Sequence, residues 1–341
     1  MPSDLARAGA WLLRSGIQLA SGGVARHYRL DTGRNSPIST EITGYLASTF
    51  AYLHTLTGVP EFLDRAAAAA RFLTETAWDP VARTVPFELE PPALTYFFDC
   101  GIVVRGLIAA SQATGERQFL DTAVSIGDAM AADFTPIDGG YQPVLELPGK
   151  RPIEIDPLRW SRAPGCYQLK SAMAWFDLWE ATGEPRFRDR YDRALESALP
   201  AAAGFLPGHP DREKVMDRLH AWLYFLEGLL PCTEDPRCAE ALCSGIRRAS
   251  QYLLEIAPLF ERSDVYAQLL RMRFYAGPAL DRDAAGREME TLRSFQRPDG
   301  GFYFGRKGAS WLPHVSPVST AFAIQALALW EGAVPDRRLL I

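Results

Sequence analysis

Residues 41–77, EITGYLASTFAYLHTLTGVPEFLDRAAAAARFLTETA, contain two helical patterns of different character. The first pattern is apolar on all sides and ends in Thr57-Gly58. Glycine ends a helix readily, because it adopts the left-handed backbone conformation without steric cost. The second pattern begins at Pro60 and is apolar on one side only. A helix that is apolar all round is buried, whereas a one-sided helix covers it, so the segment predicts a hairpin of an inner and an outer helix.

Five such hairpins follow one another along the chain, and their inner helices start near residues 41, 99, 166, 220 and 264. A sixth apolar helix, from residue 316, has no outer helix after it. An amphipathic helix at residues 5–19 precedes the first inner helix and is also left without a partner. Pairing these two ends closes a ring of six hairpins. The sequence therefore predicts an all-α fold, an (α/α)6 toroid, as a single domain over residues 1–341.

The composition excludes several classes of protein. A chain of 341 residues with 48% hydrophobic residues can bury a large core, and its net charge of −5 makes nucleic acid or an anionic membrane surface an unexpected partner. No apolar stretch reaches the roughly 18–20 residues that cross a membrane. The five cysteines are odd in number and lack the spacing of a disulfide framework, which favours reduced thiols. We expect a cytoplasmic protein, and its oligomeric state is left open.

Long connecting segments precede four of the inner helices, at residues 21–40, 78–98, 136–165 and 298–320. They are rich in proline and aromatic residues, and the toroid places all of them on the rim where the inner helices begin. Long loops of this kind usually shape a functional site. The helix N-termini that meet at this rim carry positive potential, so the sequence predicts a cleft that favours an anionic ligand.

Three carboxylates at the inner-helix starts are candidates for acid/base chemistry. Asp99 follows the aromatic run in LTYFFDCG, where burial would raise its pKa and make it a general acid or base. Glu41 and Asp264 begin other inner helices, and either could supply the second carboxylate that glycoside chemistry usually needs. For all three residues the alternative is a capping role, because aspartate in particular is favoured at a helix N-terminus.

Two polar stripes follow helical spacing. His220, Tyr224 and Glu227 share one face of an inner helix, and His220 is a further catalytic candidate. The second stripe consists of Asp264, Gln268 and Arg271, where Arg271 binds either a substrate carboxylate or a neighbouring acid. Both stripes could instead be satisfied polar lines in the core.

Aromatic faces with polar groups between them suit a polyhydroxylated ring, which stacks on aromatics and hydrogen-bonds through its hydroxyls. The predicted substrate-binding residues are Arg34, Tyr45, Tyr96, Arg159, Trp160, Arg162, Tyr167, Lys170, Tyr224, Gln268, Arg271, Trp311 and His314.

The cysteines allow a rival interpretation. Cys100 and Cys166 start consecutive inner helices and His220 starts the next, so the three could approach one another as a catalytic zinc set. Local zinc spacing such as CxxC is absent, and buried cysteine is common as a small apolar residue. No motif for nucleotide binding or for a serine hydrolase is present. The sequence therefore predicts no cofactor and no metal ion, with zinc as an alternative.

The chain resembles the six-hairpin glycosidase superfamily, and locally the unsaturated glucuronyl and rhamnogalacturonyl hydrolases. FFDCGIVVRGLIAASQATGERQFLDTAVSIGDAM (97–130) is similar to their His-Asp-x-Gly-Phe helix and the hairpin that follows it, and SPVSTAFAIQALALWE (316–331) to their final helix. The resemblance places Asp99 on a functional aspartate of those enzymes. Phe98 stands where they have histidine, and GCYQLKSAMAW (165–175) lacks their second aspartate.

The resemblance implies a glycoside-hydrolase-like enzyme that acts on an anionic, uronate-containing saccharide, with Asp99 as acid/base. A sugar epimerase or lyase that uses His220 or His314 with Tyr224 is the first alternative. The others are a zinc or isoprenoid-type enzyme, since QRPDGGFYF (296–304) is similar to a cyclase motif, and a non-catalytic saccharide-binding toroid.

Overall fold

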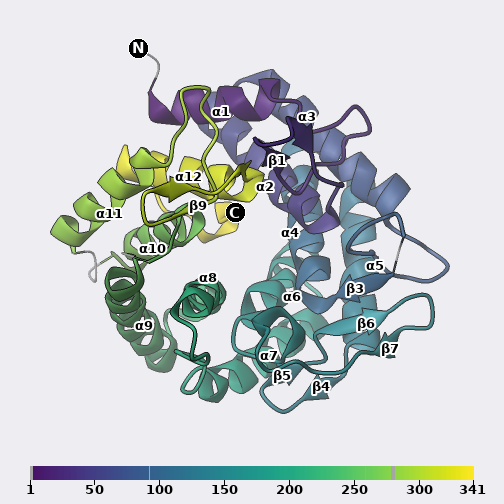
Figure 1. Cartoon of the computed structure of the whole chain (residues 1–341). Coiled ribbons are helices and arrows are strands. Elements are labelled where there is room, and N and C mark those ends of the chain that lie inside the picture. The colour runs from purple at the N-terminus through teal and green to yellow at the C-terminus, as the bar shows by residue number, and fades with distance from the viewer. Residues whose placement is uncertain (1–2, 92, 258, 278–280) are drawn as a thin grey trace. The chain divides into compact units, whose positions relative to one another are not determined.

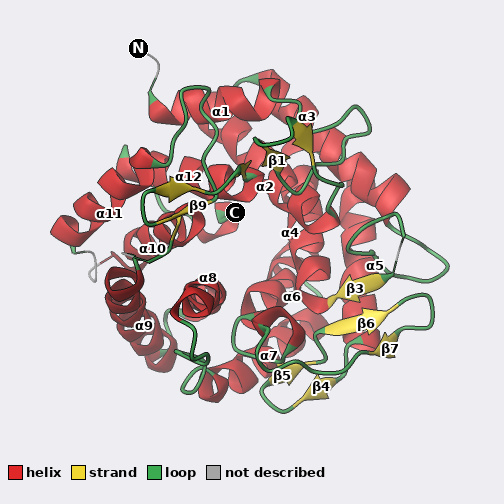
Figure 2. Ribbon diagram, viewed as in Figure 1, coloured by secondary structure: helices red, strands yellow, loops and turns green. Residues whose placement is uncertain are grey.

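The computed structural model describes residues 3–91, 93–257, 259–277 and 281–341 (Figure 1). Pro92, in the connecting segment 78–98, lies outside the described residues. Helices dominate, and the strands are short (Figure 2). The chain divides into two compact units, which we call unit 1 (residues 1–17, 26–36 and 206–341) and unit 2 (residues 18–25 and 37–205).

Unit 2 contains three of the predicted hairpins. Its inner helices are α2 (Thr40–Thr57), α4 (Phe97–Thr114) and α6 (Gln168–Thr182). Each ends at a glycine with left-handed backbone, namely Gly58, Gly115 and Gly183. The outer helices are α3 (Pro60–Arg71), which continues into a π-helical turn, α5 (Arg117–Asp133) and α7 (Pro185–Ala201). The alternation of apolar and one-sided helices thus corresponds to inner and outer helices, as predicted.

The inner helices of unit 2 approach one another at glycines. A Cβ atom on Gly106 of α4 would lie 2.4 Å from the main-chain oxygen of Gly44 on α2. A Cβ atom on Gly101 would lie 2.4 Å from the main-chain oxygen of Ser171 on α6. At Gly106 the backbones of α2 and α4 are in direct contact, and at Gly101 the space for a side chain is filled by the backbone and hydroxyl group of Ser171.

The close contact at Gly106 leads to a stability prediction. Gly106→Ala should lower the free energy of unfolding by about 1–3 kcal/mol, because the added methyl group must push α2 and α4 apart. Urea unfolding followed by circular dichroism measures this change. Gly286→Ala in α11 (Arg282–Ser294) is the control, because its added carbon would meet no atom closer than 3.9 Å. An equal loss in both variants would contradict the contact.

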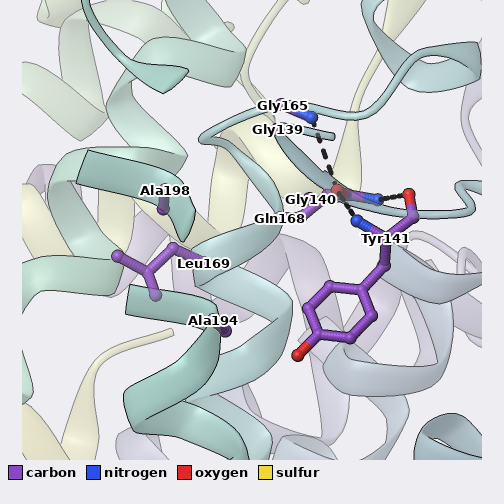
Figure 3. Close-up of a pocket in the computed structure, with 8 residues that line it drawn as sticks. All are labelled: Gly139, Gly140, Tyr141, Gly165, Gln168, Leu169, Ala194 and Ala198. Carbon is purple, nitrogen blue, oxygen red and sulfur yellow. Dashed lines mark hydrogen bonds between the residues drawn. The ribbon is translucent and has the colours of Figure 1, made fainter. Parts of the chain in front are cut away.

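Short strands in unit 2 anchor the connecting segments. β3 (Leu94–Tyr96), β6 (Val144–Glu146) and β7 (Arg151–Pro152) form one antiparallel sheet, and β4 (Pro136–Ile137) pairs with β5 (Gly140–Tyr141). The amide of Gln168 accepts from the main-chain nitrogen of Tyr141 at 2.9 Å and donates to its oxygen at 3.0 Å (Figure 3). A small pocket beside this contact is lined by Gly139, Gly140, Tyr141, Gly165, Gln168, Leu169, Ala194 and Ala198. It has no charged residue in its lining, so we interpret it as part of the loop anchor.

Unit 1 contains the other three hairpins. Its inner helices are α8 (Arg212–Leu229), α10 (Ser263–Ala276) and α12 (Pro317–Trp330). α9 (Pro236–Ile256) and α11 cover the first two of these, and α1 (Asp4–Arg14) packs against α12. The predicted pairing of the N-terminal helix with the last inner helix is therefore confirmed. α1 ends before residue 19, because Ser15 caps it and Gly16 turns the chain with φ +72°.

The predicted start of α8 was wrong by about two turns. The helix begins at Arg212, where the Asp211 carboxylate accepts from the main-chain nitrogen of Glu213 at 2.9 Å. Its first two turns are largely charged and lack the apolar pattern of an inner helix, which is why the periodicity starts only near residue 220. His220 consequently lies in the third turn of α8, not at its N-terminus.

Two three-stranded antiparallel sheets lie before the inner helices of unit 1. The first has the order β11 (His314–Val315), β1 (Tyr28–Arg29), β2 (Arg34–Asn35). The second has the order β10 (Ser310–Trp311), β9 (Gly305–Lys307), β8 (Glu261–Arg262). β8 leads directly into α10, and β11 leads into α12. In the described part of the chain, no helix combines the length and the hydropathy needed to cross a membrane.

Candidate active site

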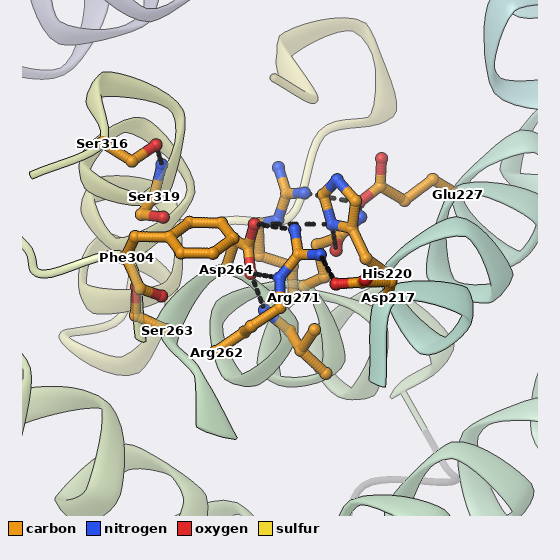
Figure 4. A network of polar contacts seen from close by, with 12 residues as sticks. Asp217, His220, Glu227, Arg262, Ser263, Asp264, Arg271, Phe304, Ser316 and Ser319 are labelled. Atoms are coloured by element: carbon orange, nitrogen blue, oxygen red, sulfur yellow. Dashed lines mark hydrogen bonds and ion pairs between the residues drawn. The ribbon is translucent and has the colours of Figure 1, made fainter. Parts of the chain in front are cut away.

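The two polar stripes of unit 1 meet in one buried network (Figure 4). His220 Nδ1 lies 2.7 Å from Gln268 Oε1, and Gln268 Nε2 lies 3.2 Å from Glu227 Oε1. Arg271 also donates to Glu227. All four side chains are buried between α8 and α10. The residues that helical spacing placed on two separate faces therefore form a continuous hydrogen-bond chain.

This chain determines the tautomer of His220. The amide nitrogen of Gln268 must face the Glu227 carboxylate, so the amide oxygen accepts a hydrogen bond from the Nδ1–H of His220. The neutral ring then carries its lone pair on Nε2. Burial lowers the pKa of His220 to about 4, and the Arg262 charge adds to this effect while Asp264 opposes it. At neutral pH His220 is an uncharged, oriented base.

Arg262 holds the carboxylate beside His220. Its guanidinium donates to both oxygens of Asp264, at 3.0 and 2.6 Å, and to Asp217 at 2.9 Å. Asp264 Oδ2 lies 3.6 Å from His220 Nδ1. Burial raises the pKa of Asp264, but the charges of Arg262 and His220 outweigh it and the net pKa is lowered. Asp264 is therefore a fixed anion and is unsuited to donate a proton.

A series of ring contacts through Phe304 connects Arg262 with two more histidines, His314 and His27. The Phe304 ring lies 4.6 Å from the Arg262 guanidinium and stacks on His314 with centroids 5.0 Å apart. His27 lies 5.0 Å from His314. Burial, followed by the nearby His314 and arginines, lowers the pKa of His27 to about 4, and burial with Arg29 lowers that of His314. These two half-buried rings are uncharged at neutral pH.

Four of these residues were not predicted as site residues from the sequence, namely Arg262, Asp217, Phe304 and His27. Arg262 and His27 lie in or beside strands of only two residues, where no periodicity distinguishes them. Asp217 lies in the charged first turns of α8, before the predicted start of this helix. The only available signal for Arg262 was its position two residues before Asp264, which allows both side chains to reach one another across a helix start.

Of the other predicted residues of unit 1, Tyr224 contacts this network directly. The Tyr224 ring lies 4.4 Å from the His220 ring. Arg34 is exposed on β2, directly opposite Arg29. Trp311 is exposed on β10 and stacks on Tyr303 with centroids 4.6 Å apart.

Unit 2 holds the remaining predicted residues. Asp99 is buried and is the third residue of α4, with Tyr96 at the N-cap position, so Asp99 is not the cap. Glu41 is the second residue of α2, where Ser39 supplies the capping hydroxyl. The Trp160 and Tyr167 rings meet edge to face at 5.0 Å. Tyr45 and Lys170 are fully buried, Tyr96 and Arg162 are half-buried, and Arg159 is exposed.

No group of three histidine, cysteine or acidic side chains among the described residues could hold a metal ion. Burial raises the pKa of Cys100 to about 12, so this residue is a thiol in the metal-free chain. The zinc alternative based on Cys100, Cys166 and His220 therefore has no support in the described part of the chain.

Solved structures with similar folds are carbohydrate-active enzymes. A sugar epimerase from a ruminal bacterium matches with a TM-score of 0.70 and 13% identity, over 96% of this chain and 100% of that one. The cellobiose 2-epimerase of Spirochaeta thermophila matches with a TM-score of 0.70 and 16% identity, over 94% and 95%. An unsaturated glucuronyl hydrolase specific for heparin matches with a TM-score of 0.70 and 12% identity, over 97% of each chain.

These matches confirm the fold class. The chain has the (α/α)6 toroid fold that its repeats predicted, and an unsaturated glucuronyl hydrolase, the kind of protein that the sequence resembles locally, is among the structures that share this fold. No protein-family model matches the chain, and no curated protein sequence is significantly similar to it. Because epimerases and a hydrolase share the fold equally, the chemistry of the site must decide between them.

The low pKa of His220 predicts a pH-dependent stability. An unfolded histidine titrates near pH 6.5. Between pH 6.5 and 4 the unfolded state therefore binds more protons than the folded state, and the free energy of unfolding decreases as the pH is lowered through this range. Lowering the pH from 7 to 4.5 should cost the wild type about 2–3 kcal/mol more than His220→Gln, which lacks this group. Urea unfolding of both proteins at the two pH values measures the difference. Parallel losses in the two proteins would contradict a buried neutral His220.

Proposed function

We propose that the chain is a carbohydrate-active enzyme of the epimerase or isomerase type, which moves a proton at a sugar carbon next to a carbonyl group. The observation that carries the proposal is the neutral His220, whose Nδ1 proton is held by Gln268 and whose lone pair is on Nε2. A base in this state can accept a proton from carbon without first losing one. The similar folds of two sugar epimerases support the same reaction class.

The reaction requires little beyond proton transfer. His220 would remove the proton from the carbon next to the carbonyl of an open-chain sugar, which leaves an enediolate. Delivery of a proton from solvent to the opposite face of that carbon gives the epimer, and His220 then returns its own proton to solvent. Delivery of the His220 proton to the neighbouring carbon gives the isomer. His314 is a second uncharged imidazole in the same unit, linked to the His220 network through Phe304 and Arg262. A second imidazole suits a reaction that needs proton exchange from two directions.

A hydrolase that acts on a uronate-containing saccharide is the second candidate. Asp99 favours it, because this carboxyl group is 5% exposed, lies in the first turn of an inner helix and follows Phe97 and Phe98. Asp264 does not suit the role of its protonated partner, since Arg262 keeps it ionised. No observation on the described residues favours the lyase, isoprenoid-type or non-catalytic alternatives.

Incubation with sugars in D2O separates the two candidates. Aldoses, ketoses and β-linked disaccharides are followed by proton NMR for deuterium at C2 and for the appearance of the epimer or ketose. Uronate-containing disaccharides are followed in parallel for new reducing ends. Deuterium incorporation that disappears in His220→Gln supports the epimerase or isomerase. New reducing ends that depend on Asp99 but not on His220 would overturn it in favour of the hydrolase.

A further inference from the structure

One face of the sheet β11–β1–β2 carries a row of basic side chains. Arg29 on β1 lies directly opposite His314 on β11 and directly opposite Arg34 on β2. Residues opposite one another share a face of the sheet, with Cβ atoms about 5 Å apart. His27 lies two residues before Arg29, on the same side, and its ring contacts His314. We call these four residues, His27, Arg29, Arg34 and His314, the basic face.

The charges of the basic face are only partly compensated. Like charges directly opposite one another in a sheet are unfavourable. Asp31 forms an exposed pair with Arg29, through Nε–Oδ1 at 3.0 Å and Nη2–Oδ2 at 2.5 Å. Arg34 forms no ion pair with any residue that the structure describes. The repulsion between these side chains is limited because the two histidines are neutral. Burial and the surrounding arginines lower the pKa values of both histidines, whereas Asp31 raises that of His314.

An anion bound to the basic face would compensate its positive charge. It would compensate Arg29 and Arg34, and it would allow His27 and His314 to become protonated donors. Arg26 and Arg262 also contribute positive potential, as their effects on the pKa of His27 and His314 show. The face is therefore prepared for a ligand with negative charge, and binding should be coupled to proton uptake.

The arrangement of donors favours a particular anion. A planar carboxylate is bound best by the fork of a single arginine, but Asp31 already occupies the fork of Arg29. The other donors come from Arg34, His314 and His27, which lie on or beside three different strands. Separate donors of this kind suit a terminal group whose three oxygens point in different directions, as in a phosphate or sulfate ester.

The basic face is connected with the candidate active site. The Phe304 ring stacks on His314 and also contacts the Arg262 guanidinium. Arg262 in turn holds Asp264 beside His220. A sugar whose charged group lies on the basic face can therefore extend along Phe304 towards His220.

We propose that the basic face binds the phosphate or sulfate ester group of an anionic sugar. The role of this group in positioning a substrate rests on the proposed function, whereas binding of the anion can be measured without any activity. The shared chemistry is a terminal group with three oxygens, and its two sources are sugar phosphates and sugar sulfates.

The first measurement is a titration of the histidine ring signals by NMR. The chain has five histidines, so single substitutions assign them. Inorganic sulfate is added at constant ionic strength, since it remains a dianion over the whole pH range used. We expect saturable shifts at His27 and His314 and a rise of at least about one unit in their pKa values. Non-saturating shifts, equal to those with chloride, would overturn the proposal.

Matched arginine variants test the face itself. Arg34→Gln should weaken sulfate binding about tenfold, because it removes a charged donor. Arg151→Gln, an exposed strand arginine of unit 2, should leave it unchanged. Equal affinities in the two variants would count against the basic face. Arg34 is exposed, so its loss should not prevent folding.

Binding of charged sugars then identifies the chemical class of the ligand. Glucose 6-phosphate and glucose 6-sulfate should both bind at least about tenfold more tightly than glucuronate, whose planar group matches the donors less well. The ranking of the two esters identifies the source of the anion. Glucuronate binding equal to or tighter than that of both esters would overturn the proposal. His220→Gln should retain sulfate binding, so a protein that binds sulfate but exchanges no sugar proton would refute the proposed function and leave this inference intact.

Discussion

Replacing Arg271 with methionine is expected to lower the free energy of unfolding by about 3–5 kcal/mol. Arg271 and Glu227 are both fully buried and ion-paired. Arg271 also donates to Gln325 and to the main-chain oxygen of Ile341, each at 3.0 Å, and its guanidinium lies 4.0 Å from the Phe322 ring. Removing the cation leaves the Glu227 carboxylate without its charge partner in a dry interior. Since domains are stable by only about 5–15 kcal/mol, this loss is large.

Urea unfolding followed by circular dichroism measures the effect, with Arg71→Met as the matched control. Arg71 forms its ion pair with Glu116 at the surface, where such pairs contribute at most about 1 kcal/mol. The double variant Arg271→Met/Glu227→Leu should recover part of the loss, because it removes the stranded charge as well. Similar losses for Arg271→Met and Arg71→Met would show that the buried pair is not the cause.

The hairpins could be predicted because burial leaves a local signature. An inner helix such as α4 is apolar on every side, and its glycine stop at Gly115 is visible in the sequence. The exception is instructive. Four of the first six residues of α8 are charged and none of these four is buried, namely Arg212, Glu213, Lys214 and Asp217, so the apolar periodicity used for prediction starts two turns late. Apolar periodicity therefore does not locate the end of a helix whose first turns are charged.

The site was less predictable, because its contacts join residues from different helices and strands. Helical spacing placed His220 and Gln268 on faces of two helices, but nothing in the sequence indicated that these faces meet at 2.7 Å. Arg262 and His27 lie in segments with no repeating pattern, and their roles depend on strand pairing and on ring contacts. The candidate carboxylates could be named, whereas their protonation depends on neighbours that only the structure reveals.

Protonation states, and not the fold, separate the two candidate reactions. A two-carboxylate hydrolase needs one carboxyl group that stays protonated near neutral pH. In unit 1, Arg262 lowers the pKa of Asp264 and removes it from that role. Burial lowers the pKa of His220 as well, but for an imidazole this change produces the neutral, proton-accepting form. The same desolvated network thus keeps Asp264 ionised and His220 unprotonated at neutral pH.

Replacing His220 with glutamine is therefore expected to lower kcat/KM for deuterium exchange at C2 by about 10²–10⁴-fold, the usual contribution of a general base. Glutamine can still donate to Gln268, so the buried network loses the base and keeps a polar partner. Because the pKa of His220 is about 4, the wild-type rate should be independent of pH from about 5.5 to 8 and should decline only as pH falls towards 4.

The pH profile discriminates between a specific base and a general loss of structure. His54→Gln, near the end of α2, serves as the control and should retain the wild-type rate. A fall in rate centred near pH 6.5 would contradict the assignment, because it would require an ordinary, solvated histidine as the base. Retained exchange in His220→Gln would exclude His220 directly. A flat profile that is lost only with His220 would establish that burial against Gln268 and Asp264 keeps this imidazole ready to accept a proton.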